Sequence, residues 1–344
     1  MKASYKRYIL NFKRPSGTSR GILTEKETWF LILEYQGKRG IGECGILRTL
    51  SFDDRPDYEE KLKWVCANIK LGKDRLWEEL RDFPSIQFGV EMAFRSLESD
   101  DPFMLYPSEF TSGKDSIPIN GLVWMGEEAF MKEQILQKID QGFRCIKLKI
   151  GAIDFETELS LLRFIRKEFT SEEMEIRVDA NGAFTPSEAL TKLNRLSELE
   201  LHSIEQPIKQ GQPEAMAQLC EQSPLAIALD EELIGVTHVT NKRDLIQMIQ
   251  PQYLIFKPSL IGGFRGASEW IDLAEESNTG WWITSALESN VGLNGISQFT
   301  YAQDNDMPQG LGTGGLYTNN FEAPLEVRQG KLWYDINKEW KFNL

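Results

Sequence analysis

Eight short apolar segments recur at nearly even intervals along the last two thirds of the chain, and each of them ends in polar or charged residues. The segments end near residues that are 25 to 30 positions apart: Asn120, Lys149, Asp179, Glu205, Asp230, Lys257, Thr284 and Gly310. An interval of this length accommodates one strand and one helix. Eight such units predict a parallel (β/α) barrel, whose active site lies at the carboxyl ends of its strands.

One helix of this repeat carries a clear start signal. Thr185 supplies an N-cap hydroxyl, Pro186 stands at the first helical position and Glu188 at the third. These residues satisfy or avoid backbone amides that the first turn of a helix leaves unpaired. The pattern predicts that a helix begins here and continues through Leu196.

The first third of the chain has a different pattern. Apolar residues alternate through Tyr8, Leu10 and Phe12, and again over residues 29–35 and 40–44. Alternation of this kind is typical of strands that bury one face. We expect a small antiparallel sheet.

Helical spacing over residues 57–70 and 85–97 completes an α+β domain, which we assign to residues 1–112. The barrel is expected over residues 113–318. A tail over residues 319–344 contains a predicted hairpin and is expected to return to the first domain.

A polar segment, Arg-Pro-Ser-Gly-Thr-Ser-Arg-Gly at residues 14–21, separates the first two predicted strands. It contains two glycines and no apolar residue that would anchor it. We expect it to be mobile and regard it as a candidate lid.

The composition is that of an ordinary globular protein, with 41% hydrophobic and 26% charged residues. A net charge of −13 argues against a nucleic-acid partner, because phosphate contacts need clustered Lys and Arg. A few buried cations would still suffice for an anionic substrate. The amino terminus alternates apolar and charged residues, and the four cysteines are scattered with no CxxC pair. We therefore expect a cytoplasmic protein with reduced thiols and no membrane partner.

Two lysines alternate with apolar residues in Cys145-Ile-Lys-Leu-Lys-Ile150. Lys147 and Lys149 therefore share one face of a strand, which in a closed barrel is the interior. The alternative is an exposed edge strand with solvated lysines. Two buried ammonium groups are expected to lower each other's pKa, and a lysine in that position can act as a base.

Three successive strands end in a carboxylate, at Asp179, Glu205 and Asp230. Any one of these acids could merely begin a loop or cap the next helix. Three acids at one rim repel one another unless a cation is shared, and three oxygen donors with open positions suit Mg²⁺. The pattern predicts a metal site.

The sixth strand is apolar until Lys257, which we expect to face the metal from across the barrel relative to Lys149. The alternative is an ion pair with Asp230 or Glu231. His202 is opposite in phase to the strand-end acid and is expected to be structural, as is His238. The sequence has neither a nucleophile elbow nor a phosphate-binding GxxxxGK.

The chain resembles the muconate lactonizing branch of the enolase superfamily across nearly its whole length. The resemblance is carried by Lys147-Leu-Lys149, Asp179-Ala-Asn181, Glu205-Gln-Pro207, Asp230-Glu231 and Lys257. It implies an α+β capping domain over a (β/α)7β-type TIM barrel. It also implies that Asp179, Glu205 and Asp230 bind Mg²⁺, with Mn²⁺ as an alternative ion. Lys149 would then remove the proton next to a metal-bound substrate carboxylate, giving an enediolate.

Two further segments, Thr284-Ser-Ala-Leu-Glu-Ser-Asn and Gly310-Leu-Gly-Thr-Gly-Gly, are similar to the subfamily that makes o-succinylbenzoate for menaquinone. This resemblance implies syn elimination of water from a succinyl-substituted cyclohexadiene carboxylate, with Lys149 as base and then acid. It implies substrate-binding roles for Thr284, Ser285, Gly310 and Arg177. Thr284 stands where serine is common, and Gly312 where aspartate is expected.

Three alternatives remain at this point. Racemases of N-acylamino acids and epimerases of dipeptides would use Lys149 and Lys257 as two bases, although Gly310-Leu-Gly312 lacks the Asp-x-Asp expected of a dipeptide epimerase. A Schiff-base aldolase would need a strand-end lysine but not three carboxylates. A barrel without catalysis would bind metal and turn nothing over. Whether the chain is a monomer or a homo-oligomer is open.

Overall fold

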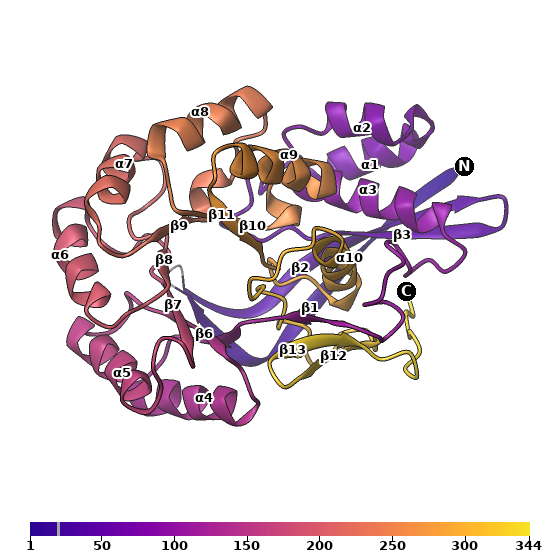
Figure 1. The fold of residues 1–344 in the computed structure, drawn as a ribbon. Coiled ribbons are helices and arrows are strands. Elements are labelled where there is room, and N and C mark those ends of the chain that lie inside the picture. Colours follow the sequence, from indigo (N-terminus) through magenta and orange to yellow (C-terminus); the bar gives the residue numbers. More distant parts are fainter. Residues whose placement is uncertain (19–20) are drawn as a thin grey trace.

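The computed structural model describes residues 1–18 and 21–344. An antiparallel sheet with three helices packs beside a barrel of parallel strands that is ringed by helices (Figure 1). This is the predicted fold class, a modified TIM barrel with an α+β capping domain. No helix in the described part of the chain has both the length and the apolar character needed to cross a membrane.

The capping sheet has the order β1-β2-β3, with β1 at Lys2–Thr18, β2 at Gly21–Tyr35 and β3 at Lys38–Cys44. The expected helices are present as α1 (Tyr58–Ala67) and α3 (Pro84–Glu98), and a shorter α2 (Lys73–Glu79) and the 3₁₀ turn η1 (Ile69–Leu71) lie between them. The apolar residues Trp29, Leu31 and Leu33 of β2 form one core with these helices.

Two glycines allow α3 to lie directly on β3. A Cβ atom at Gly40 would stand 2.3 Å from the carbonyl oxygen of Ala93, and one at Gly42 would stand 1.9 Å from that of Gly89. Real side chains do not tolerate such distances, so the close approach of helix and strand requires glycine at both positions.

The predicted lid segment is partly strand. β1 extends to Thr18 and pairs with the start of β2 through Ser16 and Leu23, after an irregularity in register beyond Asn11. Strand pairing at residues 16–18 uses backbone groups and therefore does not require apolar side chains. The mobility and the lid role expected for residues 14–21 remain predictions. Residues 19–20 of the proposed lid lie outside the described residues.

Seven parallel strands form the barrel in sequential order. They are β5 (Gly121–Val123), β6 (Cys145–Lys149), β7 (Glu175–Asp179), β8 (Ser203–Glu205), β9 (Ile227–Leu229), β10 (Tyr253–Phe256) and β11 (Gly280–Ile283). Parallel bridges from Gly310 to Thr284 and from Gln309 to Ile119 close the ring. The predicted eighth strand is thus only a short extended segment.

The first barrel strand also differs from its predicted end near Asn120. Residues Ser116–Pro118 form a separate strand, β4, which pairs with the tail hairpin β12 (Leu325–Arg328) and β13 (Lys331–Tyr334). The strand that pairs with β6 is β5, at Gly121–Val123. One apolar stretch is therefore divided between two sheets, which periodicity alone does not reveal.

Helices surround the barrel as the repeat predicts (Figure 1). They are α4 (Glu128–Asp140), α5 (Phe155–Glu168), α6 (Pro186–Ser197), α7 (Pro213–Gln222), α8 (Val239–Ile249), α9 (Gly263–Glu276) and α10 (Asn290–Tyr301). The predicted capping box at the start of α6 is confirmed, with Thr185 and Glu188 each binding the other's backbone. Short 3₁₀ turns, η2 (Glu231–Leu233) and η3 (Pro258–Leu260), follow β9 and β10.

The tail returns to the capping domain, as expected. Trp340 stacks on Phe103 with ring centroids 4.1 Å apart. Phe342 packs against Phe30 of β2 at 5.4 Å. Residues from both ends of the chain therefore share one apolar core.

Candidate active site

The carboxyl ends of neighbouring barrel strands bring the predicted charged residues together. Lys149 lies beside Asp179 in the register of β6 and β7, and Asp179 lies beside Glu205 in that of β7 and β8. Asp230 follows β9 directly, and Lys257 follows β10. The three carboxylates are almost completely buried.

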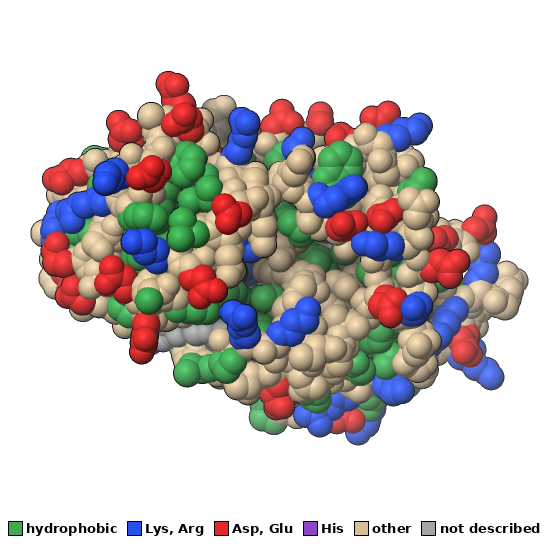
Figure 2. Space-filling view, turned by 90° about the horizontal axis from the view of Figure 1, so that it is seen from below, with side chains coloured by type: hydrophobic (Ala, Val, Ile, Leu, Met, Phe, Trp, Pro, Cys, Tyr) green, Lys and Arg blue, Asp and Glu red, His purple; other side chains and the backbone are tan. Residues whose placement is uncertain are grey.

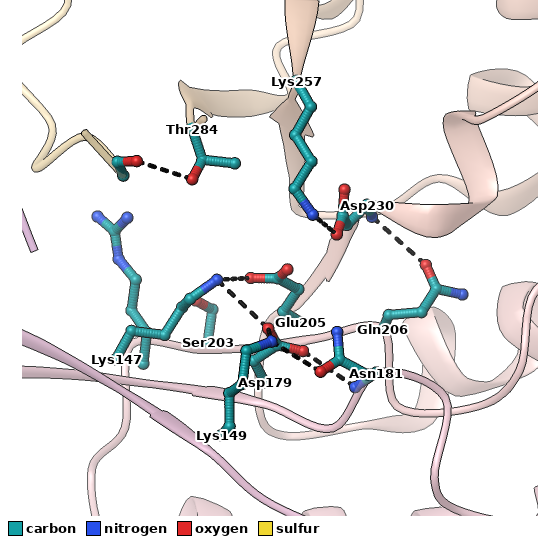
Figure 3. A network of polar contacts seen from close by, with 12 residues as sticks. Lys147, Lys149, Asp179, Asn181, Ser203, Glu205, Gln206, Asp230, Lys257 and Thr284 are labelled. Atoms are coloured by element: carbon teal, nitrogen blue, oxygen red, sulfur yellow. Dashed lines mark hydrogen bonds and ion pairs between the residues drawn. The ribbon is translucent and has the colours of Figure 1, made fainter. Parts of the chain in front are cut away.

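Both lysines of β6 point toward these carboxylates, which confirms that they share the interior face (Figure 3). Lys147 Nζ lies 2.7 Å from Glu205 Oε2 and 3.3 Å from Asp179 Oδ2. Lys149 Nζ lies 2.8 Å from Asp179 Oδ2 and 2.8 Å from Asn181 Oδ1. Each ammonium therefore holds two oxygen atoms.

Lys257 reaches the same group from the other side of the barrel (Figure 3). Its ammonium pairs with Asp230, so the ion pair weighed as an alternative is present. This pairing does not withdraw the lysine from the site, because Lys257 and Lys149 both line the same cavity. We call the six residues Lys147, Lys149, Asp179, Glu205, Asp230 and Lys257 the strand-end cluster.

The expected lowering of a lysine pKa is wrong for Lys147. Burial would lower its pKa, but the carboxylates of Glu205 and Asp179 together raise it well above the ordinary value. The pKa of Lys257 is raised in the same way, chiefly by Asp230 against the effect of burial. Three carboxylates within the cluster outweigh the repulsion between ammonium groups.

The pKa values of two of the carboxylates, Asp179 and Glu205, are shifted in opposite directions. Burial would raise the pKa of Asp179, but Lys149 and Lys147 hold it well below its usual range. Burial, together with repulsion from Asp179, raises the pKa of Glu205 to about 8. A second buried carboxylate next to an ionised one is the arrangement that a divalent cation would relieve.

The residues of the cluster fit a divalent cation by their donor chemistry. Within residues 1–18 and 21–344, no three acidic, His or Cys side chains form a ready-made metal site. Each of the three carboxylates contacts a lysine. Glu205 Oε1 is nevertheless buried without a hydrogen-bond partner in that part of the chain. An unsatisfied carboxylate oxygen beside two other carboxylates offers the all-oxygen ligands that Mg²⁺ prefers.

A cavity of about 600 Å³ opens above the cluster. Lys147, Lys149, Asp179 and Lys257 lie at its polar end. Its apolar walls come from both domains and include Leu23, Leu47, Leu50, Trp124, Phe130, Leu287 and Leu316. Figure 2 shows a hollow near the centre of one face with hydrophobic side chains inside it, on a surface where Lys and Arg are interspersed with Asp and Glu. A site of this kind suits a small, partly apolar anion.

Three of the four predicted substrate-binding residues line this cavity, namely Thr284, Ser285 and Gly310. Thr284 Oγ1 donates to the carbonyl oxygen of Gly310 at 3.0 Å, and a Cβ atom at Gly310 would stand 2.0 Å from Thr284 Oγ1. Gly310 therefore has to be glycine for the wall to close. The Ser285 hydroxyl lies 2.6 Å from that of Thr313.

Arg177 lies elsewhere in the barrel interior. Its guanidinium donates to Glu175 at 2.6 Å and to the carbonyl oxygen of Pro308 at 2.9 Å, and it stacks over Trp282. It is not among the residues that line the cavity. In the register of β6 and β7 it lies beside Lys147, two residues before Asp179. His202 packs on Tyr253, consistent with a structural role.

Sequence reasoning regarded residues 14–21 of the capping domain as a candidate lid, and Arg14, Pro15 and Gly21 of that segment line the cavity. It missed the other residues of the capping domain that line the cavity. Leu23, Leu47, Arg48 and Leu50 line it, and the last three belong to the loop after β3. This loop has no periodicity and no motif of its own. Only the resemblance to a capped barrel could have indicated that this loop reaches the site.

Comparison with known proteins agrees with this geometry. Residues 130–335 match the family described as enolase C-terminal domain-like. The chain belongs to this family, and the predicted membership of the enolase superfamily is confirmed.

Comparison with individual proteins shows which enzymes of the family this chain is similar to. The o-succinylbenzoate synthase of Desulfotalea psychrophila is 47% identical to this chain, over 96% of this chain and 98% of that protein. The crystal structure of MenC from the same organism has a TM-score of 0.86 at 44% identity, covering 97% of this chain and 99% of that one. The N-succinylamino acid racemase of Thermus thermophilus is 28% identical over 80% of this chain and 75% of that protein. The predicted likeness to o-succinylbenzoate synthases is thus confirmed.

Proposed function

We propose that this protein dehydrates a succinyl-hydroxycyclohexadiene carboxylate to o-succinylbenzoate in the cytoplasm, as a step of menaquinone biosynthesis. The observation that carries the proposal is the pair Lys149 and Lys257, which approach three buried carboxylates from opposite sides at the polar end of the cavity. The 47% identity to an o-succinylbenzoate synthase supports it.

In this proposal Lys149 removes the proton next to the substrate carboxylate and then gives a proton to the departing hydroxide. Both transfers occur on one face, so one residue performs the syn elimination. Asn181 and Asp179 orient its ammonium. Lys257 keeps its proton and stabilises the enediolate charge from the other face.

Asp179, Glu205 and Asp230 would hold Mg²⁺, and Mn²⁺ would serve as an alternative ion. When bound, the ion would take a carboxylate of the substrate and neutralise the charge that develops on it. Lys147 would orient Asp179 and Glu205, which it already contacts.

The remaining walls of the cavity would hold the rest of the substrate. We assign the succinyl tail to the side formed by Thr284, Ser285 and Gly310, and the ring to the apolar side chains. Arg177 would support this wall from below through the carbonyl of Pro308. We also propose a capping domain formed by residues 1–112 and 319–344.

A second function, racemisation of N-succinylamino acids, is favoured by the same two lysines, because a base on each face is what a two-base mechanism requires. The 28% identity to an N-succinylamino acid racemase supports it. Epimerisation of dipeptides is less well supported, since Gly310-Leu-Gly312 offers no carboxylate for a dipeptide ammonium.

The test is turnover of the cyclohexadiene substrate with Mg²⁺, followed by its ultraviolet absorbance. Wild-type protein and the exposed-lysine control Lys167→Ala are expected to turn it over, and Lys149→Ala is not. Absence of turnover by wild-type protein, with α-proton exchange in N-succinylamino acids instead, would replace the dehydratase by the racemase.

A further inference from the structure

A buried lysine of the capping domain lies with two carboxylates at the boundary with the barrel. Lys26 of β2 is 3% exposed, while Glu43 of β3 and Glu288 of the loop after β11 are fully buried. Among the described residues, Lys26 Nζ has no hydrogen-bond partner. A buried ammonium without a partner is costly, so its presence calls for a physical explanation. We call Lys26, Glu43 and Glu288 the interdomain cluster.

Glu43 joins the capping sheet to a barrel helix. Its carboxylate accepts hydrogen bonds from Thr28 Oγ1 at 2.8 Å, from the backbone N–H of Ser289 at 2.9 Å and from that of Gly292 at 2.8 Å. Ser289 is the N-cap of α10, so the carboxylate sits where the helix dipole favours a negative charge. The start of α10 is therefore bound by the cap.

Glu288 joins two strand-end loops of the barrel. Its carboxylate accepts from the backbone N–H of Ala286 at 2.8 Å and from the Ser259 hydroxyl. Ala286 lines the cavity next to Ser285, and Ser259 stands two residues beyond Lys257. One carboxylate thus bridges the wall assigned to the substrate tail and the segment that carries a site lysine.

The atoms around Glu288 are closely packed. A Cβ atom at Gly45 of the cap would stand 3.0 Å from Glu288 Cγ, and one at Gly292 of α10 would stand 2.8 Å from Glu288 Cβ. At these two glycines the backbone lies directly against the side chain of Glu288. A displacement of Glu288 would therefore be transmitted to the loops that it binds.

The charges within the cluster depend on one another. Burial lowers the pKa of Lys26, and Glu288 and Glu43 oppose this effect. Burial raises the pKa of Glu288, and Lys26 opposes it. Tyr317 also faces the group, with its hydroxyl donating to the carbonyl oxygen of Leu287 and its pKa raised by burial. The Lys26 side chain, with the hydrogen bond from Ser259, thus opposes the rise in the pKa of Glu288 that burial causes.

We propose that Lys26 is a positioning residue that acts through Glu288 to hold the 284–288 wall of the cavity. The role of this wall in substrate binding rests on the proposed function. The cap would then determine how tightly the substrate tail is bound without contributing a group to proton transfer. Loss of the ammonium would weaken the charge-assisted hydrogen bonds of Glu288 and loosen the wall.

The proposal is tested with Lys26→Met, with the double variant Lys26→Met/Glu288→Gln, and with Lys6→Met as an exposed control on β1. Amide hydrogen exchange over residues 284–292 is measured without substrate, and kcat and KM are measured with the cyclohexadiene substrate and Mg²⁺. We expect Lys26→Met to raise both exchange and KM about tenfold, with kcat changed less than about threefold. The double variant is expected to recover most of both effects, because it removes the uncompensated carboxylate.

Exchange and KM of Lys26→Met equal to those of Lys6→Met would overturn the proposal, as would a fall in kcat at constant KM. Ser259→Ala serves if Lys26→Met does not fold, because it removes one hydrogen bond of Glu288 and leaves the charges in place. Faster exchange confined to residues 284–292 supports the proposal in that variant, and unchanged exchange refutes it. If wild-type protein shows no turnover, the proposed function fails, while the exchange measurement still decides whether Lys26 holds the wall.

Discussion

The strand-end cluster and the interdomain cluster both combine buried lysine with buried carboxylates, but they differ in how the carboxylate oxygen atoms are satisfied. Both oxygens of Glu43 and both oxygens of Glu288 accept hydrogen bonds from nearby backbone or hydroxyl groups. Glu205 Oε1, in contrast, has no partner in the part of the chain that the structure describes. A saturated carboxylate is fixed in place, whereas an unsaturated one beside a cavity is available to a ligand.

The largest expected difference concerns activity. Lys149→Met is expected to lower kcat/KM by about 10⁴-fold, because the residue transfers protons twice. Lys257→Met is expected to cost about 10²- to 10³-fold, because it removes charge stabilisation alone. Steady-state kinetics with the cyclohexadiene substrate measure both. Equal losses in the two variants would indicate that both lysines act as bases and would break the assigned division of roles.

The next largest effect concerns metal binding. Glu205→Gln is expected to weaken Mg²⁺ binding by more than about 100-fold, measured by calorimetry, with the exposed Glu221→Gln as control. Unchanged affinity in Glu205→Gln would mean that the unsatisfied oxygen is not a metal ligand.

The raised pKa of Glu205 also predicts that the stability of the metal-free protein depends on pH. The pKa of Glu205 is raised to about 8, above its value in the unfolded chain, so the folded state binds more protons between these values. Stability is then present at low pH and is lost as the pH rises toward 8. Urea unfolding at several pH values should show this loss in wild-type protein and a smaller one in Glu205→Gln.

A substitution in the interdomain cluster should change the free energy of unfolding more than it changes kcat. Glu43→Gln is expected to lower the free energy of unfolding by about 3 kcal/mol, because two backbone amides and two hydroxyl groups lose a charged acceptor. The value of kcat should stay within about threefold of wild type. Chemical denaturation and kinetics against the exposed Glu34→Gln measure the two effects. A large fall in kcat without a loss of stability would contradict the contrast between the clusters.

Glu91 also joins the cap to the barrel, and its expected effect on the free energy of unfolding is smaller. It lies on α3 of the cap and accepts from the backbone N–H of Phe264 at 2.7 Å, at the start of α9. Burial raises its pKa to about 7, so its contribution to stability is lost as the pH rises through 7. Relative to Glu91→Gln, wild-type protein should lose on the order of 1–2 kcal/mol between pH 5 and pH 8. A constant difference across that range would show that Glu91 does not titrate there.

These two clusters also differ in how far the sequence predicts them. The strand-end residues follow from the repeat, because each βα unit places one strand end at the same rim. Lys26 gives no comparable signal, since Thr24-Glu-Lys-Glu-Thr28 has the composition of an exposed strand. Its burial results from the approach of the loop after β11, which lies more than 250 residues further along the chain. Contacts of that range leave no local pattern.

The ends of the helices and strands are likewise predictable only where they depend on residues close in the sequence. The division of residues 116–123 between β4 and β5 depends on the tail hairpin, which pairs with β4 from the far end of the sequence. The capping box at Thr185 was predictable because all of its partners lie within four residues. The sequence thus predicts the barrel, its rim residues and the start of α6, whereas the part of the cavity wall formed by the loop after β3 requires the folded structure.

The aromatic residues near the end of the chain also determine when the protein can complete its fold. Phe30 and Phe103 are synthesised well before their partners Phe342 and Trp340, which lie more than 230 residues further along the chain. The barrel strands, which pair in sequential order, can assemble while synthesis continues. A nascent chain that has not yet reached Trp340 therefore lacks the aromatic partners that cover Phe30 and Phe103, although its barrel strands are already made.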